Sequence, residues 1–207
     1  MKNLFLAIAI LAFIVGCSNT REKKEENKEH EHEMHDDSAK SEDHSQHEIK
    51  TDDSKKKPLS PRTAAMAMIG SNHVHIDYGS PGKRGRMIFG GLVGYGTVWA
   101  TGAHKATTIT FDENVSINRV NISAGKYGLF TIPGEKEWII IINKDWDMHL
   151  ADDYNEANDI VRVIALVQTL DVVVESLTFE VKELDDKNGT VTIKWDQTTV
   201  SFDVKNQ

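Results

Sequence analysis

Histidines are the residues of this sequence best suited to chemistry, and five of the nine gather in one segment. These five are His30, His32, His35, His44 and His47. Imidazole is a common ligand for zinc, copper and nickel, and short His-rich tracts can collect such ions. Met34 lies among them and adds a soft sulfur that copper(I) favours. We interpret the segment either as a low-specificity copper or zinc collector or as a hydrophilic spacer.

A second pair of histidines lies in a stretch with the period of a β-strand. His73 and His75 alternate with apolar residues, and Asp77 follows on the same face because strand side chains alternate. The pair can hold zinc or copper if a third ligand approaches, and His104 is the candidate. The alternative, which we favour, is a solvent-facing polar stripe opposite a core stripe. That core stripe comprises Val74, Ile76 and Tyr78.

A basic cluster lies in the longest irregular segment of the sequence, residues 79–96. Its lysine and arginines could bind a carboxylate, sulfate or sugar phosphate, or could simply belong to a solvated loop. The candidate ligand-binding residues are Lys83, Arg86, Trp99, Thr101 and His104. A cleft lined by Arg86, Trp99 and His104 would favour binding or catalysis, and a filled interior would favour a structural role.

The sequence carries no recognisable catalytic signature. It contains no Gly-x-Ser-x-Gly motif, P-loop, dinucleotide-binding fingerprint or His-Glu-x-x-His motif. We therefore expect a non-enzymatic binding module of the cell envelope. The alternatives are a copper- or zinc-binding envelope protein and an envelope hydrolase, whose site would lie between the 79–96 loop and residues 99–104.

Composition limits the partners and the number of domains. The 207 residues include 24 Lys and Arg against 32 Asp and Glu, a net charge of -8. This acidic balance argues against a non-specific nucleic-acid binder, which needs basic residues to neutralise phosphates. A single cysteine cannot form an intramolecular disulfide. The length suits one domain with an appendage.

The first residues have the pattern of a bacterial lipoprotein signal peptide, which we place at residues 1–16. An apolar run over residues 4–15 is too short for a comfortable transmembrane helix, and the only cysteine, Cys17, follows it closely. Residues 14–17 resemble the bacterial lipobox, which implies acylation of Cys17 (palmitate among the chains) and a membrane anchor. Ser18 in place of Asp favours the outer membrane, by resemblance to the enteric sorting rule. A plain secretory signal with an incidental cysteine is the alternative.

Two regions follow the signal peptide. Residues 17–60 are rich in charge and poor in apolar side chains, so we expect a disordered, acidic, His-rich tether. Residues 61–207 predict an all-β domain, an antiparallel β-sandwich of jelly-roll or Greek-key type, because short period-two runs alternate with turns. Strands are predicted at 73–78, 107–111, 115–117, 127–132, 138–142, 160–167, 177–181, 191–195 and 200–204.

Four further patterns refine this expectation. Ile139 to Ile142 have no polar face, which predicts a strand buried on both sides. Lys187-Asn188-Gly189 predicts a tight hairpin turn. Residues 146–158 are acidic and predict a short helix or a loop. The four tryptophans are more typical of core packing than of a sugar-stacking surface.

A run of ordered motifs resembles a known family. These motifs are Tyr78-Gly79-Ser80-Pro81, Lys83 to Val93, Tyr95 to Trp99, Thr101-Gly102-Ala103, Ala106 to Ile109, Ala124 to Gly134 and Glu137-Trp138. The pattern is similar to domain-of-unknown-function family 2911, a group of exported bacterial proteins, many of them lipoproteins. The resemblance implies a β-sandwich-like domain in the cell envelope and no established activity.

The sequence departs from that family pattern at one cluster. In the family, Arg usually follows the tryptophan at Trp99, and Asn-Glu follows the Gly-Ala pair. Here these positions hold Ala100, His104 and Lys105. If the usual residues form a polar binding cluster, this chain has lost that charge pair and gained an imidazole.

Overall fold

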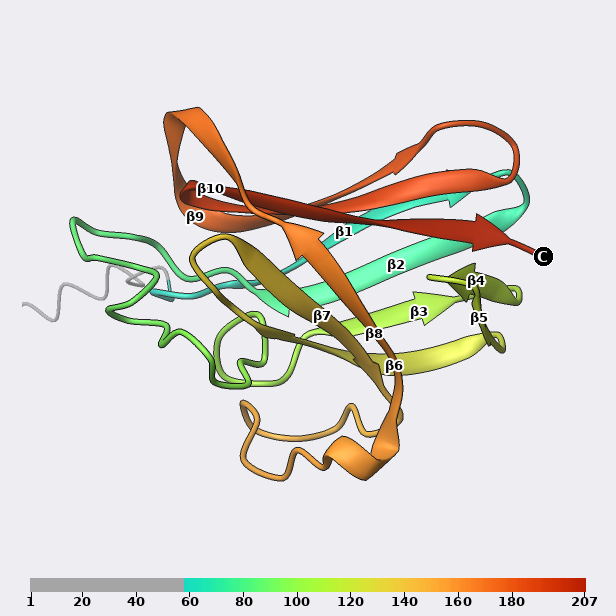
Figure 1. Ribbon diagram of the computed structural model, residues 1–207, viewed down its shortest axis with the longest axis horizontal. Helices are drawn as coiled ribbons and strands as arrows, with labels where there is room; N and C mark the ends of the chain where they lie inside the picture. Colours follow the sequence, from blue (N-terminus) through green and yellow to red (C-terminus); the bar gives the residue numbers. More distant parts are fainter. Residues whose placement is uncertain (1–57) are drawn as a thin grey trace, which may run out of the picture. The chain divides into compact units, whose positions relative to one another are not determined.

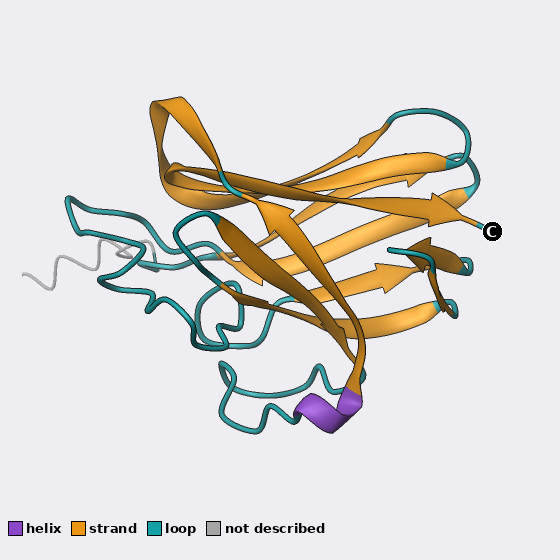
Figure 2. Cartoon of the chain, viewed as in Figure 1, coloured by secondary structure: helices purple, strands orange, loops and turns teal. Residues whose placement is uncertain are grey.

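Ten strands form two antiparallel sheets in the computed structural model, which describes residues 58–207 (Figures 1 and 2). The six-stranded sheet has the order β1 (Arg62–Ile69), β2 (Asn72–Gly79), β3 (Thr108–Phe111), β6 (Gly125–Ile132), β7 (Glu137–Asn143) and β8 (Asp159–Leu166). The four-stranded sheet has the order β5 (Val120–Ile122), β4 (Val115–Ile117), β10 (Asn188–Asn206) and β9 (Gln168–Glu183). The predicted β-sandwich is confirmed. The predicted signal peptide, residues 1–16, lies outside the described residues. So do residues 17–57 of the predicted tether.

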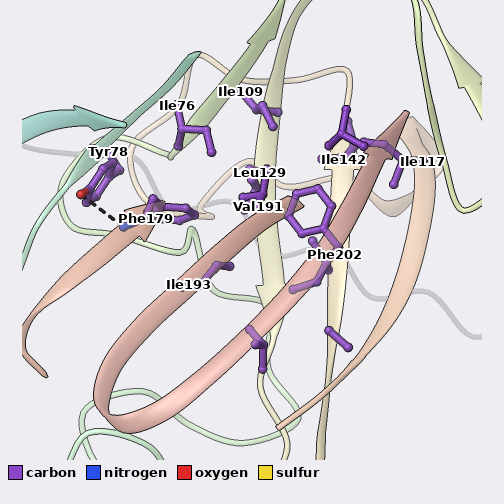
Figure 3. Packing of buried hydrophobic residues seen from close by; sticks show 14 of the residues in the cluster. Ile76, Tyr78, Ile109, Ile117, Leu129, Ile142, Phe179, Val191, Ile193 and Phe202 are labelled. Carbon is purple, nitrogen blue, oxygen red and sulfur yellow. Dashed lines mark hydrogen bonds between the residues drawn. The ribbon is translucent and has the colours of Figure 1, made fainter. Parts of the chain in front are cut away.

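The core lies between the two sheets, and the alternation in β2 shows how the sequence builds it. Val74 and Ile76 are fully buried, whereas His73 and His75 point away and are half-exposed. Figure 3 shows buried side chains from both sheets packed together. Across the sandwich, the rings of Tyr78 and Phe179 lie 4.6 Å apart, and the Phe179 N–H donates to the Tyr78 hydroxyl at 3.3 Å. Period-two burial thus places one face of each strand in the shared core.

Strand β7 is buried on both faces, as its isoleucine run predicts. Ile140 and Ile142 belong to the core between the sheets. Ile141 points to the other face and packs with Phe130 and Met148 in a second cluster. That cluster is covered by the irregular segments around residues 98–106 and 144–158, so these loops are held against the outer face of the sheet. The segment 144–158 contains one short 3-10 helix, Glu156–Asn158.

Four strands differ from the sequence-based expectation. Strand β5 was not predicted, and β9 spans Gln168–Glu183 where only 177–181 was expected. Strand β1 was not predicted, because its sequence alternates alanine with methionine, and alanine is a weak strand former. Its conformation comes from pairing along its whole length with β2. We expected two separate strands at 191–195 and 200–204, but β10 continues through both. Its pairing with β9 shifts register on either side of Asp196, so the irregular residues are accommodated without ending the strand. A hairpin joins β9 and β10 as predicted, but its turn lies at residues 184–187, and Asn188 and Gly189 already belong to β10.

The chain between β2 and β3 is the longest irregular segment of the domain, as expected (Figure 2). It follows the carboxyl end of β2 at one end of the sandwich. Within the part of the chain that the structure describes, no helix is long and apolar enough to cross a membrane.

Candidate functional site

A cavity of about 520 Å³ opens among the loops that follow β2. Its polar lining consists of Ser60, Arg84, Arg86, His104 and His149. Its other lining residues are Leu59, Pro81, Leu92, Val93, Trp99, Gly102, Ala103, Leu150 and Trp195. A mostly apolar hollow of this size with a few convergent polar groups is the usual form of a small-molecule site. The cavity lies between the 79–96 loop and residues 99–104, where the sequence predicted the site of any activity.

Three of the five predicted ligand-binding residues meet in this cavity. Arg86, Trp99 and His104 all line it. Lys83 instead turns to β10, where its ammonium lies 2.5 Å from the Asp196 carboxylate. Thr101 is fully buried beneath the cavity, and its hydroxyl bonds to the Thr131 hydroxyl at 3.2 Å. These two residues hold the loops in place and do not line the cavity.

Strand β9 fixes the loop that carries the two arginines. The Leu177 N–H donates to the Pro81 carbonyl at 3.0 Å, and the Lys83 N–H donates to the Glu175 carbonyl at 2.6 Å. The Arg84 backbone N–H donates to the Glu175 carboxylate at 2.8 Å. The loop therefore extends the edge of the four-stranded sheet, which gives its side chains a defined position despite the lack of regular structure.

Close backbone packing positions the opposite wall of the cavity. Trp99 exchanges two backbone hydrogen bonds with Thr131 of β6, at 2.8 and 2.9 Å. At the end of β2, Gly79 lies so close to the Ala103 carbonyl that a Cβ at Gly79 would collide with it. The glycine thus permits residues 102–104 to lie directly against β2. The Leu150 N–H then donates to the His104 carbonyl at 2.7 Å and adds the 149–150 segment to the wall.

Backbone strain concentrates at the cavity. Arg84, His104 and Leu150 line it and have φ of 50°, 67° and 50°. Residues other than glycine rarely adopt such angles, because their Cβ approaches the backbone carbonyl. Each such residue costs on the order of 1 kcal/mol or more, and strained residues are found disproportionately at binding and catalytic sites.

An aromatic cluster forms the inner wall. Trp99 and Trp195 both line the cavity, and their rings stack with centroids 5.9 Å apart and planes inclined by 22°. Phe89 and Trp138 pack edge-on against them from the core side. The indole N–H groups already donate to the carbonyls of Gly102 and Glu175. The tryptophans therefore present apolar ring surface to the cavity rather than a hydrogen-bond donor.

The charged groups of the lining are all basic. Arg84 and Arg86 carry permanent charge, and His104 and His149 can gain one, whereas the lining includes no Asp or Glu. Both guanidiniums donate to backbone carbonyls, Arg86 to those of Gly82 and Lys83 and Arg84 to that of Leu59. Among residues 58–207, no ion pair joins either guanidinium to a carboxylate. In a protein of net charge -8, this lining concentrates positive charge beside apolar surface.

One histidine of the cavity has an acid–base partner. The His149 Nδ1 lies 2.9 Å from an oxygen of the Asp152 carboxylate, and both side chains are exposed. An aspartate in this position can hold an imidazole in a fixed orientation. Ser60 lines the same cavity, but within the described chain no hydrogen bond links its hydroxyl to either histidine. The nucleophile–base contact that defines a hydrolytic dyad is therefore absent from this arrangement.

His104 does not join His73 and His75, the pair with which the sequence predicted a metal site in this domain. His73 and His75 lie on the outer face of β2 with ring centroids 5.8 Å apart, while His104 faces the cavity. No group of three or more His, Cys, Asp or Glu side chains between residues 58 and 207 could hold a metal ion. The His73–His75 stripe is solvent-facing, as the favoured alternative predicted. The five tether histidines lie outside the described residues.

Sequence reasoning missed several lining residues. Trp195 lies 96 positions after Trp99 in the sequence, and only the packing of the sandwich brings the two rings together. His149 and Leu150 reach the cavity through the pairing of Lys105 with His149. No local signal in the sequence marks these contacts, because each joins segments far apart in the chain.

Comparison with known proteins identifies the family of this chain. Residues 60–204 match the family described as "Protein of unknown function (DUF2911)". Comparisons with curated proteins and with solved structures returned no match. Because the match spans almost the whole β-sandwich and most of the chain, this protein belongs to the DUF2911 family.

Proposed function

We propose that this protein is a lipid-anchored binding module of the bacterial cell envelope whose cavity holds a small anionic amphiphile. The ligand class is a carboxylate or phosphate attached to an apolar body. The observation that carries this proposal is the cavity lining, in which two arginines and two histidines lie beside stacked tryptophans and no Asp or Glu is among the lining residues.

The basic side chains of the lining suit the anionic group of such a ligand, and the apolar side chains suit its apolar body. Arginine donors bind carboxylates and phosphates through charge-assisted hydrogen bonds. Leu92, Val93 and the ring surface of Trp99 offer the apolar contact that would bury the rest of the molecule. A volume of about 520 Å³ lies in the range that accommodates small organic ligands.

The anchor is proposed from the sequence. The apolar run before Cys17 and the lipobox-like residues 14–17 support acylation, and Ser18 supports transfer to the outer membrane. Growth with labelled palmitate tests this directly. We expect label on the wild-type protein and none on Cys17→Ser, which should leave the membrane fraction. Equal labelling of the two proteins would exclude Cys17 as the acylation site.

The ligand class is tested by calorimetry on the mature chain carrying Cys17→Ser, which avoids acylation. Three probes share one apolar chain and differ in charge: dodecanoate, dodecanol and dodecyltrimethylammonium. We expect one dodecanoate per chain, with weaker binding of dodecanol and of the cation. Dodecyl phosphate then tells whether the site prefers a carboxylate or a phosphate.

A matched pair of arginine variants isolates the charge. Arg84→Gln removes a charge from the cavity and should weaken dodecanoate binding about tenfold, the value of a hydrogen bond to a charged group. Arg119→Gln removes the same charge from the turn between β4 and β5, away from the cavity lining, and should leave binding unchanged. Equal binding of the three probes, or no binding of any, would overturn the proposal.

A second candidate, envelope hydrolysis, is favoured by one observation, the hydrogen bond between His149 and Asp152 beside the cavity. A hydrolase would cleave a dodecanoyl ester such as p-nitrophenyl dodecanoate, and His149→Asn would abolish the cleavage. Binding of dodecanoate without turnover of the ester supports the binding module instead.

A further inference from the structure

The outer face of the β1–β2 hairpin carries two methionines and two histidines side by side. In the register of the two strands, Met66 pairs with His75 and Met68 pairs with His73. Residues directly opposite each other in antiparallel strands point to the same face, with Cβ atoms about 4.5–5.5 Å apart. Because side chains alternate, all four lie on the face away from the core.

The four side chains are close enough to share one small ion. The two imidazole rings have centroids 5.8 Å apart. The strand register places a thioether beside each ring, so the four donors form a compact two-by-two arrangement. Long, flexible methionine side chains can bring their sulfur atoms inward from the edge strand.

The methionines are exposed without a packing reason. Met66 and Met68 are 54% and 47% exposed, whereas Ala65 on the opposite side of β1 packs against the core. Their exposed position opposite the two histidines leaves both thioether sulfur atoms accessible to an ion. Asp112 lies 3.9 Å from the His73 Nδ1 and adds a negative charge next to the cluster.

The chemistry of this donor set selects one metal ion. Thioether sulfur is a soft ligand that suits copper(I), and imidazole binds copper in either oxidation state. Zinc is bound by thiolate, imidazole and carboxylate, so the two thioethers add nothing for zinc. We propose that Met66, Met68, His73 and His75 form a copper(I)-binding site on the outer face of the β1–β2 hairpin.

The site does not depend on the proposed ligand of the cavity. None of its four residues lines the cavity. The acidic balance of the chain, -8, favours a cation. The sequence of the predicted tether carries the same two donor types, since Met34 lies among its five histidines.

The test separates the hairpin from the tether. The background is the mature chain with Cys17→Ser, in which the five tether histidines are replaced by glutamine and Met34 by leucine. Copper(I) is titrated under anaerobic reducing conditions in competition with the chelator bicinchoninate. We expect one copper(I) per chain, with both sulfur and nitrogen neighbours in X-ray absorption spectra.

Two variants identify the ligands. Met66→Leu/Met68→Leu should weaken copper(I) binding tenfold or more and leave zinc binding by the histidine pair unchanged. The matched control is Met87→Leu, since Met87 is 71% exposed and lies in the 79–96 loop, outside this cluster. Thermal denaturation of each variant shows that it is folded.

A second measurement needs no substitution in the site. Addition of silver(I), a redox-stable substitute for copper(I), should shift the methyl resonances of Met66 and Met68 and the ring resonances of His73 and His75, and not the Met87 methyl resonance. The proposal is wrong if copper(I) does not bind, if binding shows nitrogen neighbours alone, or if Met87→Leu weakens it as much as the double variant.

Discussion

Trp99 and Trp195 stack face to face, with ring centroids 5.9 Å apart and planes inclined by 22°, although one belongs to a loop and the other to β10. Trp195 is almost fully buried, yet both rings border the cavity. The contact joins the irregular segment after β2 to the four-stranded sheet. It makes the cavity wall part of the core, so the site is supported by the rigid part of the fold.

The stacked pair gives a prediction about the cavity wall. Trp195→Phe removes part of a buried ring and should lower the free energy of unfolding by about 1–3 kcal/mol. It should also weaken dodecanoate binding, because Trp195 lines the cavity. Trp138→Phe is the control, since Trp138 belongs to the same aromatic cluster and does not line the cavity. Chemical denaturation and calorimetry check both; an equal effect of the two variants on binding would contradict the assignment.

The ion pair between Lys83 and Asp196 predicts a role in stability rather than in binding. Both side chains are only 22% exposed, so Lys83→Met leaves a carboxylate largely desolvated and unpaired. We expect a loss of about 1–3 kcal/mol in the free energy of unfolding. Lys194→Met, which breaks the more exposed pair with Glu180, should cost less than about 1 kcal/mol. Urea denaturation measures both, and a Lys83→Met cost no larger than that of Lys194→Met would refute the prediction.

Close packing at Gly79 predicts sensitivity to a single methyl group. Gly79→Ala drives a Cβ into the Ala103 carbonyl, so residues 102–104 must move and carry His104 with them. We expect a loss of about 1–3 kcal/mol in stability and weaker dodecanoate binding. Gly82→Ala is the matched control in the same loop, because its Cβ would meet neighbours only at 3.5 Å and beyond. If both substitutions are tolerated equally in denaturation and calorimetry, the packing argument fails.

Tyr154 predicts a loss of stability at high pH. Burial and the hydrogen bond to Asp159 raise the pKa of Tyr154 to about 12, although the Arg162 guanidinium opposes them. The unfolded chain ionises this tyrosine near pH 10. Because the folded pKa is the higher one, the stabilisation is complete below about pH 10 and is lost as pH rises toward 12.

The measurement is the free energy of unfolding of wild type and Tyr154→Phe at pH 8 and pH 11. We expect Tyr154→Phe to be less stable at pH 8, where it lacks the hydrogen bond to Asp159, and to lose less stability than wild type between the two pH values. In absorbance titration, Tyr154→Phe should remove one tyrosine ionisation near pH 12. An identical pH dependence of the two proteins would exclude the contribution of Tyr154.

Much of the fold was predictable because its signals are local. The alternation around Val74 and Ile76 indicates a strand with one buried face. The unbroken run Ile139 to Ile142 indicates a strand with two buried faces. Asn188-Gly189 indicated a hairpin between β9 and β10, although the turn itself lies just before this pair, at residues 184–187. Strand β1 had no such signal, since its alanines and methionines become a strand only through pairing with β2.

The candidate site was predictable only in part. The sequence indicated the 79–96 loop and three lining residues, Arg86, Trp99 and His104, from residue type and glycine density. It assigned Lys83 to the same set, because the sequence does not show that β10 brings Asp196 to meet its ammonium. It paired His104 with His73 and His75, because residue types alone carry no information on which side of a loop a side chain faces.

By itself, the sequence determined the strand-forming domain, its family and the residue types available for binding, since these follow from local periodicity and ordered motifs. Only the tertiary structure decided which of those residues meet. It stacked Trp195 on Trp99, removed Lys83 from the cavity, and placed Met66 and Met68 opposite His75 and His73. The physical reason is that register and sheet packing join segments far apart in the chain, and no local pattern of residues encodes those distances.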